Sequence, residues 1–234
     1  MLFRSSVAAT VQSKVYGAVD PTLTYTVSGL QLTDTEAGVL TGALTRAAGE
    51  VVGPYAITQG GLAANANYTI NFTGTTLTIN PAALSVAATV QSKVYGAVDP
   101  VLTYTVSGLQ LTDTEAGVLT GALTRAAGEG VGAYAITQGS LLANANYTIS
   151  FTGNTLVVVA SPPTILSLTV ADPTHVVILW SAISNVTYRV QGRPDFNTEW
   201  VDLASDVRAT NVTASAVDNT GGAGPRFYRL LVVP

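Results

Sequence analysis

The sequence lacks cysteine, has one histidine and one methionine, and carries few charges, since only 10% of its 234 residues are Asp, Glu, Lys or Arg. The absence of cysteine excludes thiolate catalysis, disulfide frameworks, cysteine-bound zinc and iron–sulfur clusters. A serine triad or a histidine metal site needs several groups in one place, so we expect the lone His175 to be an ordinary surface residue of a strand. Ordinary soluble domains contain roughly a quarter charged residues. The low charge content, with 22 glycines and 47% hydrophobic residues, favours many short strands.

Charge of either sign is too sparse to attract nucleic acid or an anionic membrane. The 10 basic and 14 acidic residues give a net charge of −4, and Lys14 and Lys93 are the only lysines. Uninterrupted apolar runs, such as residues 176–180, are far shorter than the ~20 residues of a spanning helix. We therefore expect no nucleic-acid partner and no membrane span. No apolar segment of a secretory signal follows the first residues, so residues 1–6 are interpreted as a leader or the start of a fragment.

A long internal repeat dominates the sequence. Residues 7–77 return at 86–156, an offset of 79 residues, with seven substitutions between the two copies. A proline-rich stretch at 161–163 is typical of a linker. These features divide the chain into repeat 1 (7–81), repeat 2 (82–160) and a non-repeating C-terminal domain (161–234).

Within each repeat, apolar and polar residues alternate with the period of half-buried strands. The clearest run places Leu23, Tyr25 and Val27 on one face and threonines on the other. The same alternation adds these residues to the expected core: Tyr55, Ile57, Tyr68, Ile70, Phe72, Leu77 and Ile79. We expect five or six mostly antiparallel strands in each repeat, with a hairpin turn at Thr73-Gly74. The fold class is all-β, and a β-grasp-like sheet and a small sandwich both remain open.

One helical turn is expected in each repeat. Thr33 and Glu36 have the spacing of a capping box, in which the threonine caps a backbone N–H and the glutamate reaches back. Repeat 2 has the same pattern at Thr112 and Glu115. The turn should lie between the second and third strands.

The order of turn and strand residues in both repeats resembles the MBG domain of the YGX type. The matching residues of repeat 1 are Lys14-Val15-Tyr16-Gly17, Asp20-Pro21, Leu23-Thr24-Tyr25, Gly29-Leu30, Leu44-Thr45-Arg46, Gly49, Gly53, Tyr55-Ala56-Ile57, Gly60 and Asn67-Tyr68-Thr69-Ile70. The resemblance implies tandem modules of large bacterial surface or secreted proteins of adhesin type. It implies no enzyme activity, because the motif consists of glycines, tyrosines and apolar strand residues.

The C-terminal domain is also predicted to consist of strands. The expected strands are 165–171, 175–180, 187–191, 200–203, 212–217 and 226–233. A tryptophan closing the second strand (Trp180), then Tyr188 and Phe227-Tyr228, resembles the fibronectin type III and immunoglobulin-like modules. That resemblance implies a β-sandwich.

Candidate chemical sites have simpler structural explanations. The Asp34/Glu36 and Asp113/Glu115 pairs offer oxygens to calcium, but helix capping explains the same spacing. The other acids are spread over three small domains, which disfavours a glycoside hydrolase. We therefore expect no catalytic residue, no metal, no cofactor and no enzyme activity.

Lys14 and Lys93 occupy equivalent positions in the two repeats. An exposed lysine that protects a strand edge is one interpretation. The other is a covalent bond to an asparagine of the same repeat, such as Asn65 or Asn144, beside Glu50 or Glu129.

Three functions follow from these observations. The first is a structural stalk or adhesion segment of an extracellular bacterial surface protein, whose partners are neighbouring repeats or subunits of the same protein. The second is a module that binds a surface glycan or protein through the C-terminal domain, with residues 193–200 as the candidate loop. The third is a filament subunit that lends the apolar tail Leu230–Val233 to a neighbouring chain.

Overall fold

The computed structural model describes residues 2–222, 224 and 226–233. Its regular structure consists of strands and two single-turn helices, which confirms the all-β fold class. Neither helix is long and apolar enough to cross a membrane. The chain divides into two compact units. Unit 1 comprises Met1–Thr89, Leu102–Thr124 and Thr137–Asn154, and unit 2 comprises Val90–Val101, Arg125–Ile136 and Thr155–Pro234. The boundary therefore passes through repeat 2.

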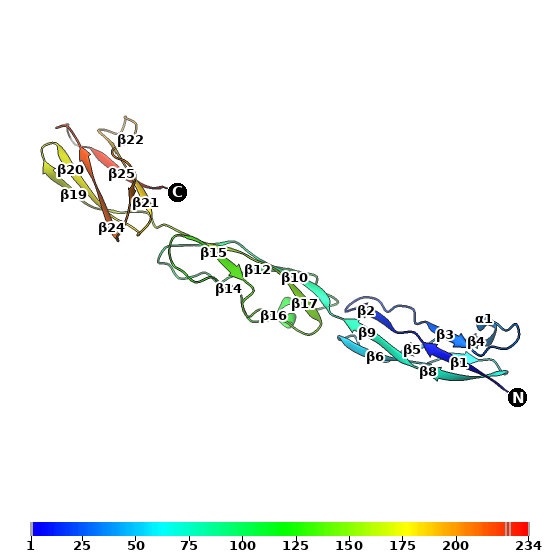
Figure 1. Cartoon of the computed structure of the whole chain (residues 1–234). Coiled ribbons are helices and arrows are strands. Elements are labelled where there is room, and N and C mark those ends of the chain that lie inside the picture. Colours follow the sequence, from blue (N-terminus) through cyan, green and yellow to red (C-terminus); the bar gives the residue numbers. More distant parts are fainter. Residues whose placement is uncertain (1, 223, 225, 234) are drawn as a thin grey trace. The chain divides into compact units, whose positions relative to one another are not determined.

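Repeat 1 lies wholly in unit 1 and folds into small sheets. Its elements are β1 (Phe3–Ala9), β2 (Gln12–Val15), β3 (Tyr25–Ser28), α1 (Glu36–Val39), β4 (Leu40–Thr41), β5 (Thr45–Arg46), β6 (Gly53–Thr58), β7 (Ala63–Ala64), β8 (Tyr68–Thr73) and β9 (Thr75–Asn80). The sheet orders are β3-β1-β8, β2-β9-β6-β5 and β4-β7 (Figure 1). Because β1 begins at Phe3, the strand includes residues 3–6, which the sequence analysis placed ahead of the repeat.

Two parallel strand pairs run through the repeat. β1 pairs with β8 and β2 pairs with β9 in the same register, with partners such as Phe3↔Tyr68 and Gln12↔Leu77. The expectation of mostly antiparallel pairing holds for the repeat, because β1–β3, β4–β7, β5–β6 and β6–β9 are antiparallel, and these two parallel pairs are the exceptions. The hairpin predicted at Thr73-Gly74 is wrong, because β8 and β9 belong to different sheets. A side chain at Gly74 would lie 2.8 Å from the carbonyl oxygen of Ile57, which explains the glycine at this crossing.

The helical turn exists but begins later than the capping-box pattern predicts. α1 covers Glu36–Val39, its N-cap is Thr35, and no side-chain hydrogen bond caps it. It follows the third strand instead of the second. The carboxylate of Asp34 accepts a hydrogen bond from the Tyr68 hydroxyl (2.7 Å), so the acidic residue serves a tertiary contact.

Repeat 2 has the same succession of elements. Its part in unit 1 contains β10 (Ala82–Ala88), β12 (Tyr104–Ser107), α2 (Glu115–Val118), β13 (Leu119–Thr120), β16 (Leu142–Ala143) and β17 (Tyr147–Thr152). The sheet β11-β18-β15-β14 lies essentially in unit 2 and consists of β11 (Gln91–Val94), β14 (Thr124–Arg125), β15 (Gly132–Thr137) and β18 (Asn154–Val159).

The C-terminal domain forms two sheets around one core. Its strands are β19 (Ile165–Asp172), β20 (His175–Ser181), β21 (Thr187–Arg193), β22 (Val201–Asp202), β23 (Val207–Arg208), β24 (Thr213–Asn219) and β25 (Phe227–Val233). One sheet has the order β19-β20-β24, and in the other β21 pairs with β22, β23 and β25. Trp180 and Tyr188 pack edge to face between the sheets, with ring centroids 6.1 Å apart. Only the short β23 was not predicted.

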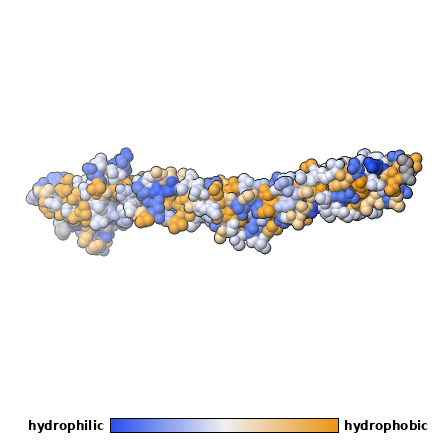
Figure 2. Space-filling model, turned by 90° about the horizontal axis from the view of Figure 1, so that it is seen from below, coloured by the Kyte–Doolittle hydropathy of each residue, from blue (hydrophilic) through white to orange (hydrophobic). Residues whose placement is uncertain are grey.

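The alternation read from the sequence identifies the inward-facing side of the strands, but six of the ten expected core residues are only half-buried: Leu23, Tyr25, Val27, Tyr55, Ile70 and Phe72. Ile57, Leu77 and Ile79 are buried in repeat 1, and their counterparts Ile136, Leu156 and Val158 are buried in repeat 2. Apolar residues also remain at the surface, scattered among polar ones on the face seen in Figure 2. Scattered exposure of this kind is normal for a soluble fold.

Candidate functional site: the interface between the repeats

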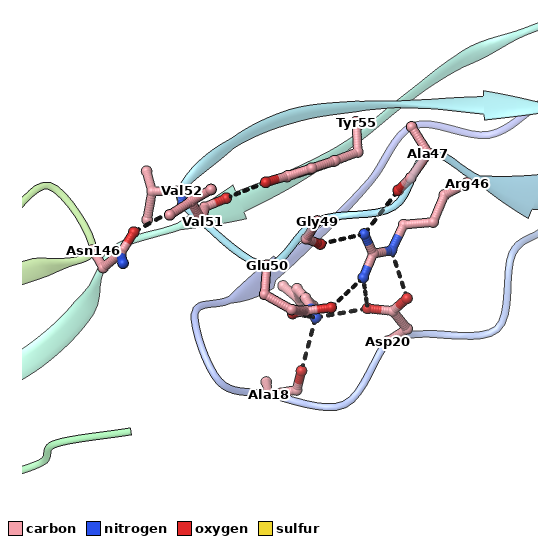
Figure 3. A network of polar contacts seen from close by, with 11 residues as sticks. Ala18, Asp20, Arg46, Ala47, Gly49, Glu50, Val51, Val52, Tyr55 and Asn146 are labelled. Carbon is pink, nitrogen blue, oxygen red and sulfur yellow. Dashed lines mark hydrogen bonds and ion pairs between the residues drawn. The ribbon is translucent and has the colours of Figure 1, made fainter. Parts of the chain in front are cut away.

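Four charged side chains form a closed ion-pair cluster in repeat 1 (Figure 3). The Lys14 ammonium lies 2.6 Å from Asp20 and 2.5 Å from Glu50, and Arg46 contacts the same two carboxylates at 2.6 and 2.5 Å. The Lys14 side chain is only 4% exposed, whereas the carboxylates are about half exposed. Each cation thus bridges both anions, which ties β2 and β5 to the two loops that carry the acids.

Arg46 also organises the backbone around it. Its guanidinium donates to the carbonyl oxygens of Ala47 (2.9 Å) and Gly49 (2.5 Å) and lies 5.2 Å from the centre of the Tyr55 ring. Repeat 2 builds the same cluster from Lys93, Asp99, Arg125 and Glu129.

The ion pairs shift the titration of their members. Hydrogen bonds from Arg46 and then Lys14 lower the pKa of Asp20 to about 2, and contact with Lys14 and then Arg46 holds the pKa of Glu50 below its usual value. Burial lowers the pKa of Lys14, but its contacts with Asp20 and Glu50 outweigh burial and raise the pKa overall. The cluster therefore stays charged well into the acid range.

This geometry corrects the interpretation of Lys14 as an exposed edge lysine. It also disfavours a bond to asparagine, because Lys14 contacts carboxylates and Asn65 donates to Gly38 O (3.2 Å) instead. A bond from the Lys14 amine to an asparagine side chain would need a neutral amine and a protonated carboxylic acid beside it. The pKa shifts of Lys14 and Asp20 favour the charged forms of both groups.

The end of repeat 1 that carries Tyr16 and Gly17 contacts repeat 2 within unit 1. The Tyr16 hydroxyl donates to Asp113 (3.0 Å), and its ring packs edge to face on Tyr147 with centroids 5.4 Å apart. Asp113 also accepts from the Tyr147 hydroxyl (2.7 Å), which in turn accepts from the Gln110 backbone N–H (2.8 Å). One carboxylate thus joins tyrosines from both repeats.

Two closer contacts complete the interface. Gly17 lies so near Gln110 that an added Cβ would be 2.6 Å from the Cβ of that residue. The backbone N–H of Val52 donates to the Asn146 side-chain oxygen (3.0 Å; Figure 3). We call Tyr16, Gly17 and Val52 the Tyr-Gly tip of repeat 1, and Gln110, Asp113, Asn146 and Tyr147 the acceptor surface of repeat 2.

The family match covers both repeats. The model of the MBG domain (YGX type) matches residues 6–78 and 84–157, more than half of the chain. The chain belongs to the MBG domain family. Each match contains one Tyr-Gly pair, and the pair of repeat 1, Tyr16-Gly17, lies at the interface between these MBG repeats. No curated protein matches the chain.

The MBG matches end at residue 157, and the fibronectin-like or immunoglobulin-like assignment of the C-terminal domain stays a prediction. Its tail is not free: Leu230 and Leu231 lie in β25, which pairs with β21 along its length. Trp200, whose exposure would favour the binding hypothesis, is half-buried, with the guanidinium groups of Arg193 and Arg229 at 4.3 and 4.5 Å from its ring centre.

The acidic pairs considered for calcium and the lone histidine do not form a common site in the described residues. Within the described residues, no three His, Cys, Asp or Glu side chains form a group that could hold a metal ion. His175 lies at the start of β20, with Nδ1 2.8 Å from Asp172 in the β19–β20 hairpin. A hydrogen bond from the Thr174 side chain is the main reason that the pKa of Asp172 falls to about 2.

The sequence analysis named Tyr16 only as part of the MBG-like motif and missed the interface. Tyr16 and Asp113 are 97 residues apart, so no local pattern links them. The one available signal was that the whole Tyr-Gly segment recurs unchanged at Tyr95-Gly96.

Proposed function

We propose that this chain is a structural spacer of an extracellular bacterial surface or secreted protein of adhesin type, and that it has no enzymatic activity. Membership of the MBG family supports a surface-protein repeat. The strongest polar clusters of the repeats are ion pairs whose members neutralise one another. Such clusters stabilise a module and leave little capacity for acid–base chemistry.

The observation that carries the proposal is the interface between the repeats. Only Pro81 separates β9 of repeat 1 from β10 of repeat 2, so the connection itself permits little freedom. The Tyr16–Asp113 and Val52–Asn146 hydrogen bonds, 3.0 Å each, then fix the orientation of repeat 1 against the part of repeat 2 that lies in unit 1. A fixed angle between successive modules is what a spacer needs to hold a terminal module away from its anchor.

The rigidity of this interface can be measured by distances between spin labels. The chain has no cysteine, so Thr69→Cys and Thr148→Cys, both at exposed positions, introduce the only labelling sites. We expect one narrow distance distribution, which broadens when Tyr16→Ala is added and stays narrow with the matched Tyr95→Ala change. A broad distribution in the unmodified interface would refute the rigid spacer.

The extracellular location needs its own experiment. Antibodies raised against the repeats should label intact producing cells or detect the protein in their medium. Detection only after lysis would overturn this part of the proposal and leave the rigidity of the interface untouched.

A further inference from the structure

Repeat 1 carries a second acceptor surface, in which Gln31, Asp34 and Asn67 are exposed and Tyr68 is buried (5% exposed) beneath Phe3. Its residues are the counterparts of those in repeat 2: Gln31, Asp34, Asn67 and Tyr68. The Tyr68 hydroxyl donates to Asp34 (2.7 Å) and accepts from the Gln31 N–H (2.9 Å), which matches the geometry in repeat 2 to 0.1 Å. The hydrogen-bond acceptor for a tyrosine is therefore in place without a tip bound to it.

A leucine beside this surface is more exposed than its counterpart in repeat 2. Leu32 and Leu111 occupy equivalent positions, both with φ +53°, a backbone conformation that is unfavourable for leucine. Leu32 is 100% exposed, whereas Leu111, beside the occupied acceptor surface, is 63% exposed. An apolar side chain held outward in a strained conformation gains stability when a partner covers it.

Repeat 2 carries the complementary half, a Tyr-Gly tip that no other repeat covers within the described residues, although its Val131 lines a hollow with Ser184 and Val232 of the C-terminal domain. Tyr95 is 42% exposed, whereas Tyr16 in the interface is 6% exposed. An added Cβ on Gly96 would meet no atom within 4 Å, whereas one on Gly17 would clash with Gln110. Val131, the counterpart of Val52, is 42% exposed.

We propose that the Tyr-Gly tip of repeat 2 docks on the acceptor surface of repeat 1 in a second copy of the chain. The argument is that the same residue types already bind each other between repeats 1 and 2. The association is head to tail, so each bound chain still offers a free tip and a free acceptor surface, and the assembly grows into a ring or an open filament. This goes beyond a spacer, because it joins separate chains end to end.

Phe3 sets the strength of this contact. Its ring lies 5.7 Å from that of Tyr68, whereas repeat 2 has Ala82 at the equivalent position and leaves Tyr147 to Tyr16. An incoming Tyr95 therefore shares Tyr68 with Phe3. The Phe3→Ala change makes this surface match that of repeat 2, and alanine is known to fit there because Ala82 is 2% exposed in the same strand position.

The experiment is sedimentation equilibrium of the full chain from about 10 μM to about 1 mM, the range of weak contacts made by a few side chains. We expect the Phe3→Ala chain to associate with increasing concentration, at least tenfold more tightly than the unchanged chain. Adding Tyr95→Phe should weaken association about tenfold, because it removes one hydrogen bond to a carboxylate. A Phe3→Ala chain that stays monomeric at about 1 mM overturns the proposal.

A mixing experiment tests the head-to-tail geometry. In the Phe3→Ala background, Tyr95→Ala removes the tip and Asp34→Ala removes the acceptor, and each chain alone should stay monomeric. Mixed in equal amounts, the two should form dimers and nothing larger, because one intact tip meets one intact acceptor surface. Association of the Tyr95→Ala chain with itself would show that another surface is responsible. A circular dichroism spectrum of each variant confirms that it is folded.

Discussion

Replacement of Tyr16 by alanine should uncouple the two repeats, and its energetic cost can be derived from the structure. Exposure falls from 42% at Tyr95 to 6% at Tyr16, so the interface buries roughly a third of a side chain of ~200 Å², or about 70 Å². At about 25 cal/mol per Å² this area contributes about 1.8 kcal/mol. The hydrogen bond to the Asp113 carboxylate adds about 1.5 kcal/mol. Tyr16→Ala should therefore lower the free energy of unfolding by about 3 kcal/mol more than Tyr95→Ala, which removes the same side chain outside the interface.

Urea unfolding followed by far-ultraviolet circular dichroism measures this difference. Both tryptophans, Trp180 and Trp200, lie in the C-terminal domain, so their fluorescence reports that domain separately and serves as an internal reference. A double-mutant cycle between Tyr16→Phe and Asp113→Asn should give a coupling of about 1 kcal/mol, and the cycle with Asp34→Asn should give none. Equal costs for Tyr16→Ala and Tyr95→Ala, within about 0.5 kcal/mol, would refute the reasoning.

Three further predictions concern the repeats, each measured by urea unfolding. Gly17→Ala should lower the free energy of unfolding by at least about 1 kcal/mol more than Gly96→Ala, because both glycines have φ +81° but only an added Cβ at Gly17 would clash with Gln110. Equal losses would show that Gly17 does not contact Gln110 in solution. Ser5 is fully buried with an unpaired hydroxyl, and repeat 2 has the buried Leu84 at the equivalent position. Ser5→Leu should therefore stabilise the fold by about 2 kcal/mol, and Leu84→Ser should destabilise it. A lower stability of the Ser5→Leu variant would show that repeat 1 has no room for the leucine side chain. Because the aspartates of both ion-pair clusters have pKa values lowered to about 2, their contribution is full above pH ~4 and should be lost only as the pH falls toward 2; a contribution already lost at pH 4 would contradict the ion-pair geometry.

The sequence alone was sufficient for the all-β fold class, the tandem repeat and the inward-facing side of several strands. These follow from local rules: successive strand residues point to opposite faces, so Tyr68 and Leu77 could be assigned to the core from their spacing. The same rules failed for the helical turn, because Thr33 and Glu36 have the spacing of a capping box but the helix begins at Glu36, its N-cap is Thr35 and no side-chain hydrogen bond caps it.

Strand direction and sheet membership were not available from the sequence. Residues 73 and 74 look like a hairpin turn because the strands on either side are short and alternating. In the structure each of these strands pairs instead with a strand about 65 residues away, which no local signal encodes. Parallel pairing of this kind depends on contacts that form only when the whole repeat has folded.

The chemistry of the charged and aromatic side chains was decided by tertiary structure alone. Composition established that two equivalent lysines exist, but burial of Lys14 between Asp20 and Glu50 depends on a carboxylate 36 residues away. Likewise, the repeat revealed two identical Tyr-Gly segments, and only the fold distinguishes Tyr16, which is covered by the next repeat, from Tyr95, which is not. Near-identical sequences have the same local propensities, so their different environments arise from what each one contacts in the folded chain.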